Sequence, residues 1–265
     1  MNDRAAKTSR RRSALLAAVV GLVPAVPIVA GILLSSQSKA ARGPVVAGYS
    51  AVLTKSAPPQ LTNRPPSSGG TAVALLLHGT TMRATAGGPR LATLTTHTEF
   101  GSPEAMWVVR QVPGWLGVVS PLAGNGRVGW IPRASATLVP ILWELKVSLS
   151  ARRLTVLYDG EVVRRYTVAI GRPAAPTPTG HFAVTDRLNT GDPTGPYGCC
   201  ILALSAHSPH AIQGWGGGNR IAIHSTPDPS SIGLPVSHGC MRLTLAEGRW
   251  LLGHIPLGTP TLISG

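Results

Sequence analysis

Short apolar segments, separated by glycine and proline, run through most of this chain. Its 265 residues include 31 glycines and 24 prolines. Both residue types interrupt helices and favour turns, so the segments between them suit β-strands better than a helical bundle. The pattern predicts an all-β fold, and the length allows one large domain or two small ones.

Residues 1–41 have the composition of a targeting segment rather than of a folded domain. Basic residues, including the run at 10–12, precede an uninterrupted apolar stretch over residues 14–34. About twenty apolar residues suffice to cross a bilayer, and the basic leader predicts that the rest of the chain lies outside the cytoplasmic membrane. Cleavage near residues 38–40 would release the protein into the cell envelope, whereas an uncleaved helix would anchor it. The sequence is compatible with both.

The chain carries a formal net charge of +14 at pH 7. Such an excess suits an anionic neighbourhood: nucleic acid, lipid or wall polymer. No nucleic-acid-binding motif accompanies it, and part of the charge belongs to the targeting segment. We therefore expect no nucleic-acid partner.

Composition divides the rest of the chain into three parts. Residues 42–70 are rich in proline, serine and threonine and indicate a linker, although residues 45–53 could begin a strand. Residues 71–138 form a first domain, with strands expected at 72–77, 90–94, 106–112, 115–119 and 129–132. Its Gly-Trp segments around Trp107, Trp115 and Trp130 resemble a bacterial SH3-type barrel; an unrelated small β domain is the alternative.

Residues 139–265 form the second domain. Asp159-Gly160 is a strong hairpin signal, and one helix is expected over residues 244–252. The segment 189–219 is long enough for a lid over a binding site. Strands are expected at 146–149, 153–158, 162–169, 180–184, around 204–205, at 221–224 and at 259–263.

The chemistry is concentrated in the run Ser237-His238-Gly239-Cys240-Met241-Arg242, with His224 upstream. A thiol nucleophile needs a base to take its proton and N–H groups to hold the oxyanion that forms on attack. His224 is the expected base and Cys240 the nucleophile, while Gly239 lets the main chain approach closely. His238 is the rival base. A zinc site at His224, His238 and Cys240 is the competing chemistry, but the spacing matches no compact zinc pattern, so we expect no metal and no cofactor.

This run resembles the signature of the L,D-transpeptidases, whose catalytic domain is called YkuD. The hairpin, the following glycine and the Thr-Pro-x-Gly at residues 177–180 are also similar to that family. The resemblance implies a β-sandwich with one short helix over residues 139–265. It also implies that the Ser225 carbonyl orients the base, and that His238 and the N–H groups of Gly239 and Cys240 shape the oxyanion pocket.

The resemblance further implies the reaction. Cys240 would attack the bond between the third and fourth residues of a peptidoglycan tetrapeptide stem, release D-alanine and pass the thioester to another stem as a 3→3 cross-link. Carbapenems would acylate Cys240. Hydrolysis of the thioester, an L,D-carboxypeptidase activity, is equally compatible with the sequence, and a non-catalytic wall-binding protein is a third possibility. Substrate contacts are expected at Ser237, Arg242, Tyr197 and Trp215, with a salt bridge for Arg242 and packing for the two aromatic residues as alternatives.

Cys199 and Cys200 are adjacent, and pairing them requires a strained ring that disulfide geometry disfavours. We expect them to be small, buried side chains rather than a disulfide pair, although the sequence leaves the pairing open; a redox role is the alternative.

Overall fold

The computed structural model describes residues 50–51, 71–210 and 212–265. These residues are mostly β-strand and include one α-helix, which confirms the predicted fold class. None of the described helices is both long and apolar enough to span a membrane. The apolar stretch at 14–34 and most of the linker at 42–70 lie outside the described residues.

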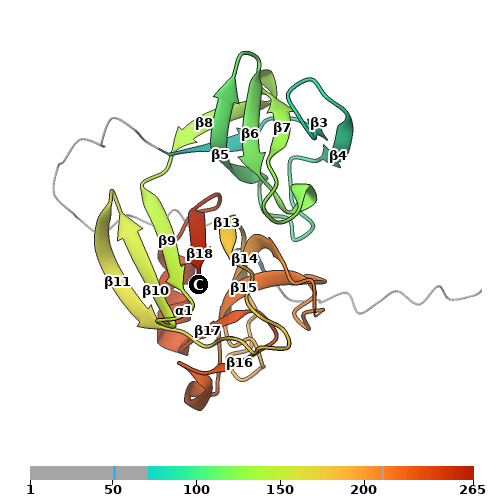
Figure 1. Cartoon of the computed structure of the whole chain (residues 1–265). Helices are drawn as coiled ribbons and strands as arrows, with labels where there is room; N and C mark the ends of the chain where they lie inside the picture. Colours follow the sequence, from blue (N-terminus) through green and yellow to red (C-terminus); the bar gives the residue numbers. More distant parts are fainter. Residues whose placement is uncertain (1–49, 52–70, 211) are drawn as a thin grey trace, which may run out of the picture. The chain divides into compact units, whose positions relative to one another are not determined.

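The first part of the chain forms a seven-stranded antiparallel sheet in the order β4-β3-β7-β6-β5-β2-β8 (Figure 1). Met82, Leu116 and Ile131 are fully buried within its own hydrophobic cluster. Gly129 is required here, because a Cβ at this position would lie 2.3 Å from the Met82 sulfur. The strands are β2 (Ala72–Leu76), β3 (Thr80–Arg83), β4 (Arg90–Leu94), β5 (Ala105–Val112), β6 (Trp115–Val119), β7 (Gly129–Pro132) and β8 (Ala136–Pro140).

The tryptophans that carry the SH3-type resemblance do not form this core. Trp107, Trp115 and Trp130 are each only partly buried. Trp115 lies under the Arg83 guanidinium, 5.9 Å from it. The resemblance to an SH3-type barrel stays a prediction.

The second part of the chain forms a sheet whose path is β11-β10-β9-β18-β13-β14-β15-β17, with β1 (Ser50–Ala51) added beside β13. A separate pair, β12 with β16, is parallel. The strands are β9 (Trp143–Ser148), β10 (Arg153–Tyr158), β11 (Glu161–Thr167), β12 (Ile170–Gly171), β13 (Gly180–Asn189), β14 (Cys200–His207), β15 (Arg220–Ser225), β16 (Pro235–Ser237), β17 (Met241–Leu243) and β18 (Pro260–Ser264).

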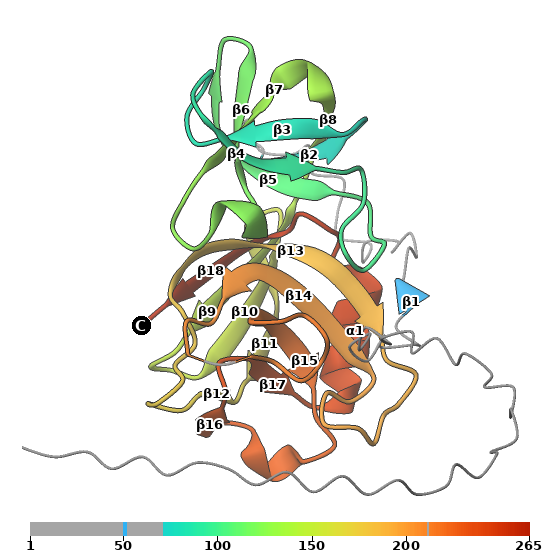
Figure 2. The same ribbon diagram turned by 90° about the vertical axis from the view of Figure 1, so that its right-hand side faces the viewer.

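The long strand β13 joins the two halves of this sheet. Its first residues pair with β18 and its later residues pair with β14, with an irregular register between Val184 and Asp186. Side chains from both halves, such as Leu154 and Ile223, enter one hydrophobic cluster. The helix α1 (Leu245–His254) adds Leu251 to the same cluster and packs on β14 and β15 (Figure 2). The predicted sandwich is therefore a continuous sheet whose halves share a core.

Candidate active site

Cys240 lies in a turn between β16 and β17 that side-chain hydroxyls hold in place. Gly239 has φ +116°, a conformation that favours glycine. The Ser237 hydroxyl donates to the Cys240 carbonyl at 2.5 Å and accepts from the Gly239 N–H at 3.1 Å. Thr177 donates to the Gly239 carbonyl at 2.8 Å. The Thr-Pro-x-Gly segment thus anchors the cysteine turn, although it is distant in sequence.

The thiol itself is buried and contacts two groups. The Ala222 N–H donates to the Cys240 sulfur at 3.3 Å, and the thiol donates to Oε1 of Gln213 at 3.4 Å. Only 2% of Cys240 is exposed. The described state is therefore one in which a neighbouring loop covers the thiol.

His224 lies two residues after Ala222 on β15, and alternate residues of a strand face the same side. Its Nδ1 lies 2.8 Å from the Ser225 carbonyl oxygen. A carbonyl only accepts, so Nδ1 carries the ring proton and the lone pair is on Nε2. The Ser225 carbonyl thus orients the imidazole as the resemblance implies, and Nε2 is the nitrogen that can accept a proton.

Both groups are uncharged in this environment. Burial raises the pKa of the Cys240 thiol to about 12, although the Ala222 N–H and the Arg242 charge lower it in part. Burial lowers the pKa of His224 to about 4, against the hydrogen bond to Ser225. At neutral pH the pair is therefore a thiol and a neutral imidazole rather than an ion pair.

Arg242 pairs with His224 across the parallel strands β15 and β17. Its charge lowers the pKa values of both His224 and Cys240. Its Nε is buried without a hydrogen-bond partner, and within the described ranges no carboxylate forms a salt bridge with it. Among the described residues no salt bridge of Arg242 occurs, and its positive charge acts on both the cysteine and the histidine.

The other predicted pocket residues divide into two groups. Ser237 is 1% exposed and its hydroxyl is engaged within the turn, so in this state it does not face a substrate. The Gly239 N–H is likewise engaged with Ser237 rather than free for an oxyanion. The His238 side chain is exposed, and its carbonyl accepts from Nε2 of Gln213 at 2.9 Å.

The two aromatic candidates have different environments. The ring of Tyr197 lies 4.8 Å from that of His224, and its hydroxyl accepts from the Gly214 N–H at 2.7 Å. Trp215 is fully buried in a cluster that contains Cys240. Its side chain lowers the pKa of the thiol without forming a full hydrogen bond. Packing is thus the observed role of Trp215, whereas Tyr197 is half-buried beside the base.

The predicted lid at 189–219 is wrong as a single segment, because β14 occupies its middle as a buried strand of the sheet. Two separate loops remain on either side of β14. The second loop carries Gln213, which the sequence did not indicate. A glutamine in an irregular glycine-rich segment has no pattern that marks it as a contact of the cysteine.

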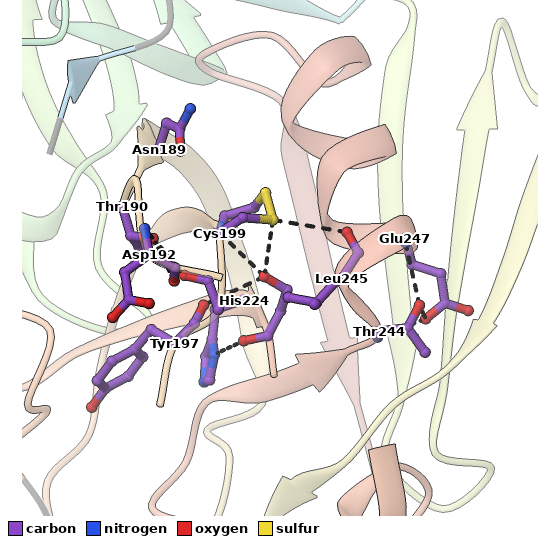
Figure 3. Close-up of a disulfide and its surroundings, with 12 residues drawn as sticks. Asn189, Thr190, Asp192, Tyr197, Cys199, His224, Thr244, Leu245 and Glu247 are labelled. Atoms are coloured by element: carbon purple, nitrogen blue, oxygen red, sulfur yellow. Dashed lines mark hydrogen bonds between the residues drawn. A yellow bond between two sulfur atoms is a disulfide. The ribbon is translucent and has the colours of Figure 1, made fainter. Parts of the chain in front are cut away.

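The expectation for the adjacent cysteines is also wrong. Cys199 and Cys200 are buried as predicted, but a disulfide joins them (Figure 3). The ring that joins neighbouring residues is strained, which disfavours such a bond in general, yet here both cysteines form it within the hydrophobic cluster that includes α1. Cys240 is the free cysteine of the chain. No group of three His, Cys, Asp or Glu side chains suited to a metal occurs within the described ranges.

Residues of the first sheet's connections contact this region. The ring of Phe100 lies 5.3 Å from that of Trp215, and Glu99 forms an ion pair with Arg220 at 2.6 Å. Arg220 begins β15, which carries the base. All described residues belong to the same compact unit of the chain, residues 43–265.

A buried thiol and an imidazole with a free ring nitrogen, on one side of a β-sheet, are the arrangement of cysteine-dependent acyl-transfer enzymes. Residues 143–263 match the L,D-transpeptidase catalytic domain, YkuD. The chain is 34% identical over 124 residues to YkuD of Bacillus subtilis, which covers 47% of this chain and 67% of that protein. The chain therefore belongs to the L,D-transpeptidase family.

Two further L,D-transpeptidases are similar to this chain. L,D-transpeptidase 1 of Mycobacterium tuberculosis is 31% identical over 128 residues, covering 44% of this chain and 49% of the relative. A solved L,D-transpeptidase from Mycobacterium smegmatis has a TM-score of 0.40 and 21% identity, covering 61% of this chain and 90% of that one.

Proposed function

We propose that this protein is a peptidoglycan L,D-transpeptidase that forms 3→3 cross-links through a thioester on Cys240. The observation that carries the proposal is that the Cys240 thiol receives the N–H of Ala222 and that His224, two residues further along the same strand, has its Nδ1 fixed on the Ser225 carbonyl. That arrangement leaves Nε2 of His224 as a proton acceptor on the face of the sheet that also holds the sulfur.

The first step begins from the neutral pair. His224 accepts the thiol proton as the Cys240 sulfur attacks the carbonyl carbon of the third stem residue. The tetrahedral intermediate then collapses, the amide bond breaks, and His224 returns the proton to the departing amine of D-alanine. Because both groups start uncharged, proton removal and attack occur together rather than from a stored thiolate.

The negative charge that develops on the substrate oxygen needs a donor. The Gly239 N–H serves only if its bond to the Ser237 hydroxyl is exchanged for one to the substrate. Arg242 supplies a positive charge nearby, and its unpartnered Nε is available as a donor. Arg242 is therefore our assignment for contact with the oxyanion or a stem-peptide carboxylate.

Substrate access requires movement of the loop that carries Gln213 and Trp215, because Cys240 is 2% exposed. Exclusion of water by the same loop favours an amine acceptor over hydrolysis of the thioester. An amine of a second stem then attacks the thioester carbonyl, and the sulfur leaves and recovers its proton.

The location follows from the predicted targeting segment. We place the catalytic region outside the cytoplasmic membrane, either anchored through residues 14–34 or secreted after cleavage. Stem peptides of the wall are the proposed partners, and the first sheet, which resembles an SH3-type domain, would position the enzyme on the wall.

The test uses the full-length protein with a carbapenem, beside a Cys240→Ala variant. Intact-mass spectrometry should show one drug molecule added to the parent and none to the variant. Incubation with tetrapeptide stems should then give a 3→3 linked dimer and free D-alanine. Tripeptide without dimer would replace the transferase by a carboxypeptidase. A folded, reduced protein that forms no adduct and no product would refute the proposal.

A further inference from the structure

The Cys199–Cys200 disulfide lies on the other side of the sheet from the proposed nucleophile. Both of its residues belong to the hydrophobic cluster that contains α1. Cys240 belongs to a different cluster, with Trp215 and Ala222. The two kinds of sulfur are therefore separated by the sheet, and the disulfide has no part in the acyl-transfer steps described above.

One residue nevertheless contacts both the disulfide and the base. The Ser225 hydroxyl accepts from the Cys200 N–H at 3.2 Å and lies 3.5 Å from the Cys199 sulfur. It also donates to the Tyr197 carbonyl at 3.4 Å. The carbonyl of the same Ser225 holds Nδ1 of His224 at 2.8 Å. The position of Ser225 thus sets the orientation of the imidazole.

There is little free space around this contact. A Cβ on Gly198 would lie 2.4 Å from the Ser225 hydroxyl oxygen. A Cβ on Gly248, in α1, would lie 2.7 Å from the Ser225 Cβ and 3.4 Å from the Cys200 Cβ. Two thiols need more room than a disulfide, because their sulfurs are no longer bonded. A sulfur that moves toward Ser225 on separation therefore displaces Ser225 or the segment that contains Tyr197, whereas one that moves away from Ser225 enters the cavity that the two cysteines line.

The disulfide lies in the wall of a cavity, although both of its residues are buried, with 7% of Cys199 and 3% of Cys200 exposed. Cys199 and Cys200 line a cavity of about 450 Å³ together with Asn189 and Arg249. Arg249 is exposed, and a nearby guanidinium stabilises the thiolate that attacks a disulfide. A cavity with a disulfide in its wall and a cation beside it has the features that thiol–disulfide exchange requires.

We propose that Cys199–Cys200 is a thiol–disulfide exchange site whose reduction by a dithiol reductant lowers the reactivity of Cys240. One thiolate of the reductant attacks a sulfur of the pair, the S–S bond breaks, and a mixed disulfide forms. The second thiol of the reductant then displaces the remaining cysteine. The reductant leaves as a disulfide, and the protein retains two thiols with both protons accounted for.

The effect on the base follows from hydrogen bonding. A disulfide sulfur donates no proton, whereas a Cys199 thiol can donate to the Ser225 hydroxyl or to the Leu245 carbonyl, 3.8 Å away. Reduction therefore adds a hydrogen-bond donor, the Cys199 thiol, beside Ser225. It also loosens the segment that contains Tyr197, whose ring packs on that of His224. The loss of Cys240 reactivity rests on the proposed function; the exchange itself does not.

The exchange is tested on the full-length Cys240→Ala variant, which retains only the two paired cysteines. The protein is equilibrated in mixtures of reduced and oxidised dithiothreitol, alkylated with N-ethylmaleimide and weighed by mass spectrometry. Two maleimides should be added together at the reducing end and none at the oxidising end, with unchanged circular dichroism. A pair that reacts only after unfolding, or that is already reduced in every mixture, overturns the proposal.

The consequence is tested on the parent protein in the same mixtures. The rate of Cys240 modification by a carbapenem, and separately by chloroacetamide, should fall about tenfold on reduction and recover on reoxidation. A Cys199→Ala/Cys200→Ala variant has no bond to reduce, so its rate should be the same in every mixture. A parent rate that changes less than twofold on reduction overturns the link to Cys240.

If the parent protein never reacts with a carbapenem, the proposed function is refuted, but the effect of reduction on Cys240 can still be measured. The chloroacetamide rate and the NMR signals of the His224 ring should still change on reduction. Constant values of both would refute the exchange site as a control of the base. If the double variant does not fold, the rates of the parent protein across the redox mixtures still show whether reduction changes the reactivity of Cys240.

Discussion

The Cys240 thiol and the His224 imidazole are both neutral at rest, which determines how their reaction responds to pH. Because burial places the pKa of His224 at about 4, the base stays available down to that pH. Because the pKa of the thiol is raised to about 12, thiolate does not accumulate near pH 8. We expect kcat/KM for acylation to fall below about pH 4 and to stay level from pH 6 to 9.

A pH–rate profile with a carbapenem checks this, since kcat/KM reports the free enzyme. His224→Ala should lower the rate by a factor of about 100 or more, the usual contribution of a general base. An acid limb near 6.5, or a rise near pH 8.5 as for a free thiol, would show that the pair is not neutral and buried when it reacts.

Gln213 covers the thiol, and its Oε1 accepts a hydrogen bond from the Cys240 sulfur at 3.4 Å. Gln213→Ala should remove this acceptor and open a path to the sulfur. We expect alkylation of Cys240 by iodoacetamide to become several-fold faster. Gln111→Ala, at an exposed position of β5, is the matched control and should leave the rate unchanged. Equal rates in all three proteins would mean that another group limits access.

At this scale the sequence predicted the residues that the chemistry requires but not those that surround them. His224, Ser225 and Cys240 follow from motif spacing and from the resemblance. Gln213 could not be predicted, because its contact depends on the path of an irregular loop. The Cys199–Cys200 bond was disfavoured by the sequence because the ring between adjacent cysteines is strained, and the sequence does not show where the local main chain accommodates that ring.

Among the elements, α1 is tied to the site because it follows β17 directly. Thr244 caps it: the hydroxyl accepts from the Glu247 N–H at 3.3 Å, and the Glu247 carboxylate accepts from the Thr244 N–H at 2.9 Å. Thr244→Ala should lower the free energy of unfolding by about 1 kcal/mol. Urea denaturation measures the change. Thr244→Ser retains the hydroxyl, so an equal loss in that variant would refute capping as the cause.

The elements that the sequence located are those with a clear apolar pattern or a turn signal. The strand at 90–94 and the turn at Asp159-Gly160 were predicted at their observed places. The strand β3 was missed because Met82 is its one buried side chain. The strand β8 was missed because it follows β7 after only a short turn and ends in Pro140. Both strands form because they pair with neighbouring strands, and neither has an apolar pattern of its own that would indicate a strand.

At the scale of the whole molecule, charged residues join the two sheets near the base. Arg220 bonds to Glu99 from the connection before β5, and it also lies 3.6 Å from the buried Asp186 on β13. Thr98 donates to the same Asp186 at 2.5 Å. Since Arg220 begins the strand that carries His224, the first sheet contributes to holding the base as well as to any contact with the wall.

Glu104 belongs to this group of charges and gives it a dependence on pH. Burial, with the charges of Asp186 and Glu99, raises the pKa of Glu104 to about 7. The folded protein therefore holds a proton there that the unfolded chain releases near pH 4.5. As the pH rises from about 4.5 through about 7, the free energy of unfolding should fall, by up to about 3 kcal/mol for this shift.

Glu104→Gln keeps the shape of the protonated side chain and cannot ionise. We expect the variant to equal the parent near pH 4 and to exceed it increasingly up to pH 8, because only the parent loses stability as Glu104 is forced to ionise beside Asp186. Urea unfolding at several pH values measures the difference. Glu144→Gln, beside Lys146 at the surface, is the control and should show no such trend. A constant difference between Glu104→Gln and the parent at every pH would mean that Glu104 is ionised throughout, and that the contact between the two sheets does not respond to pH at this residue.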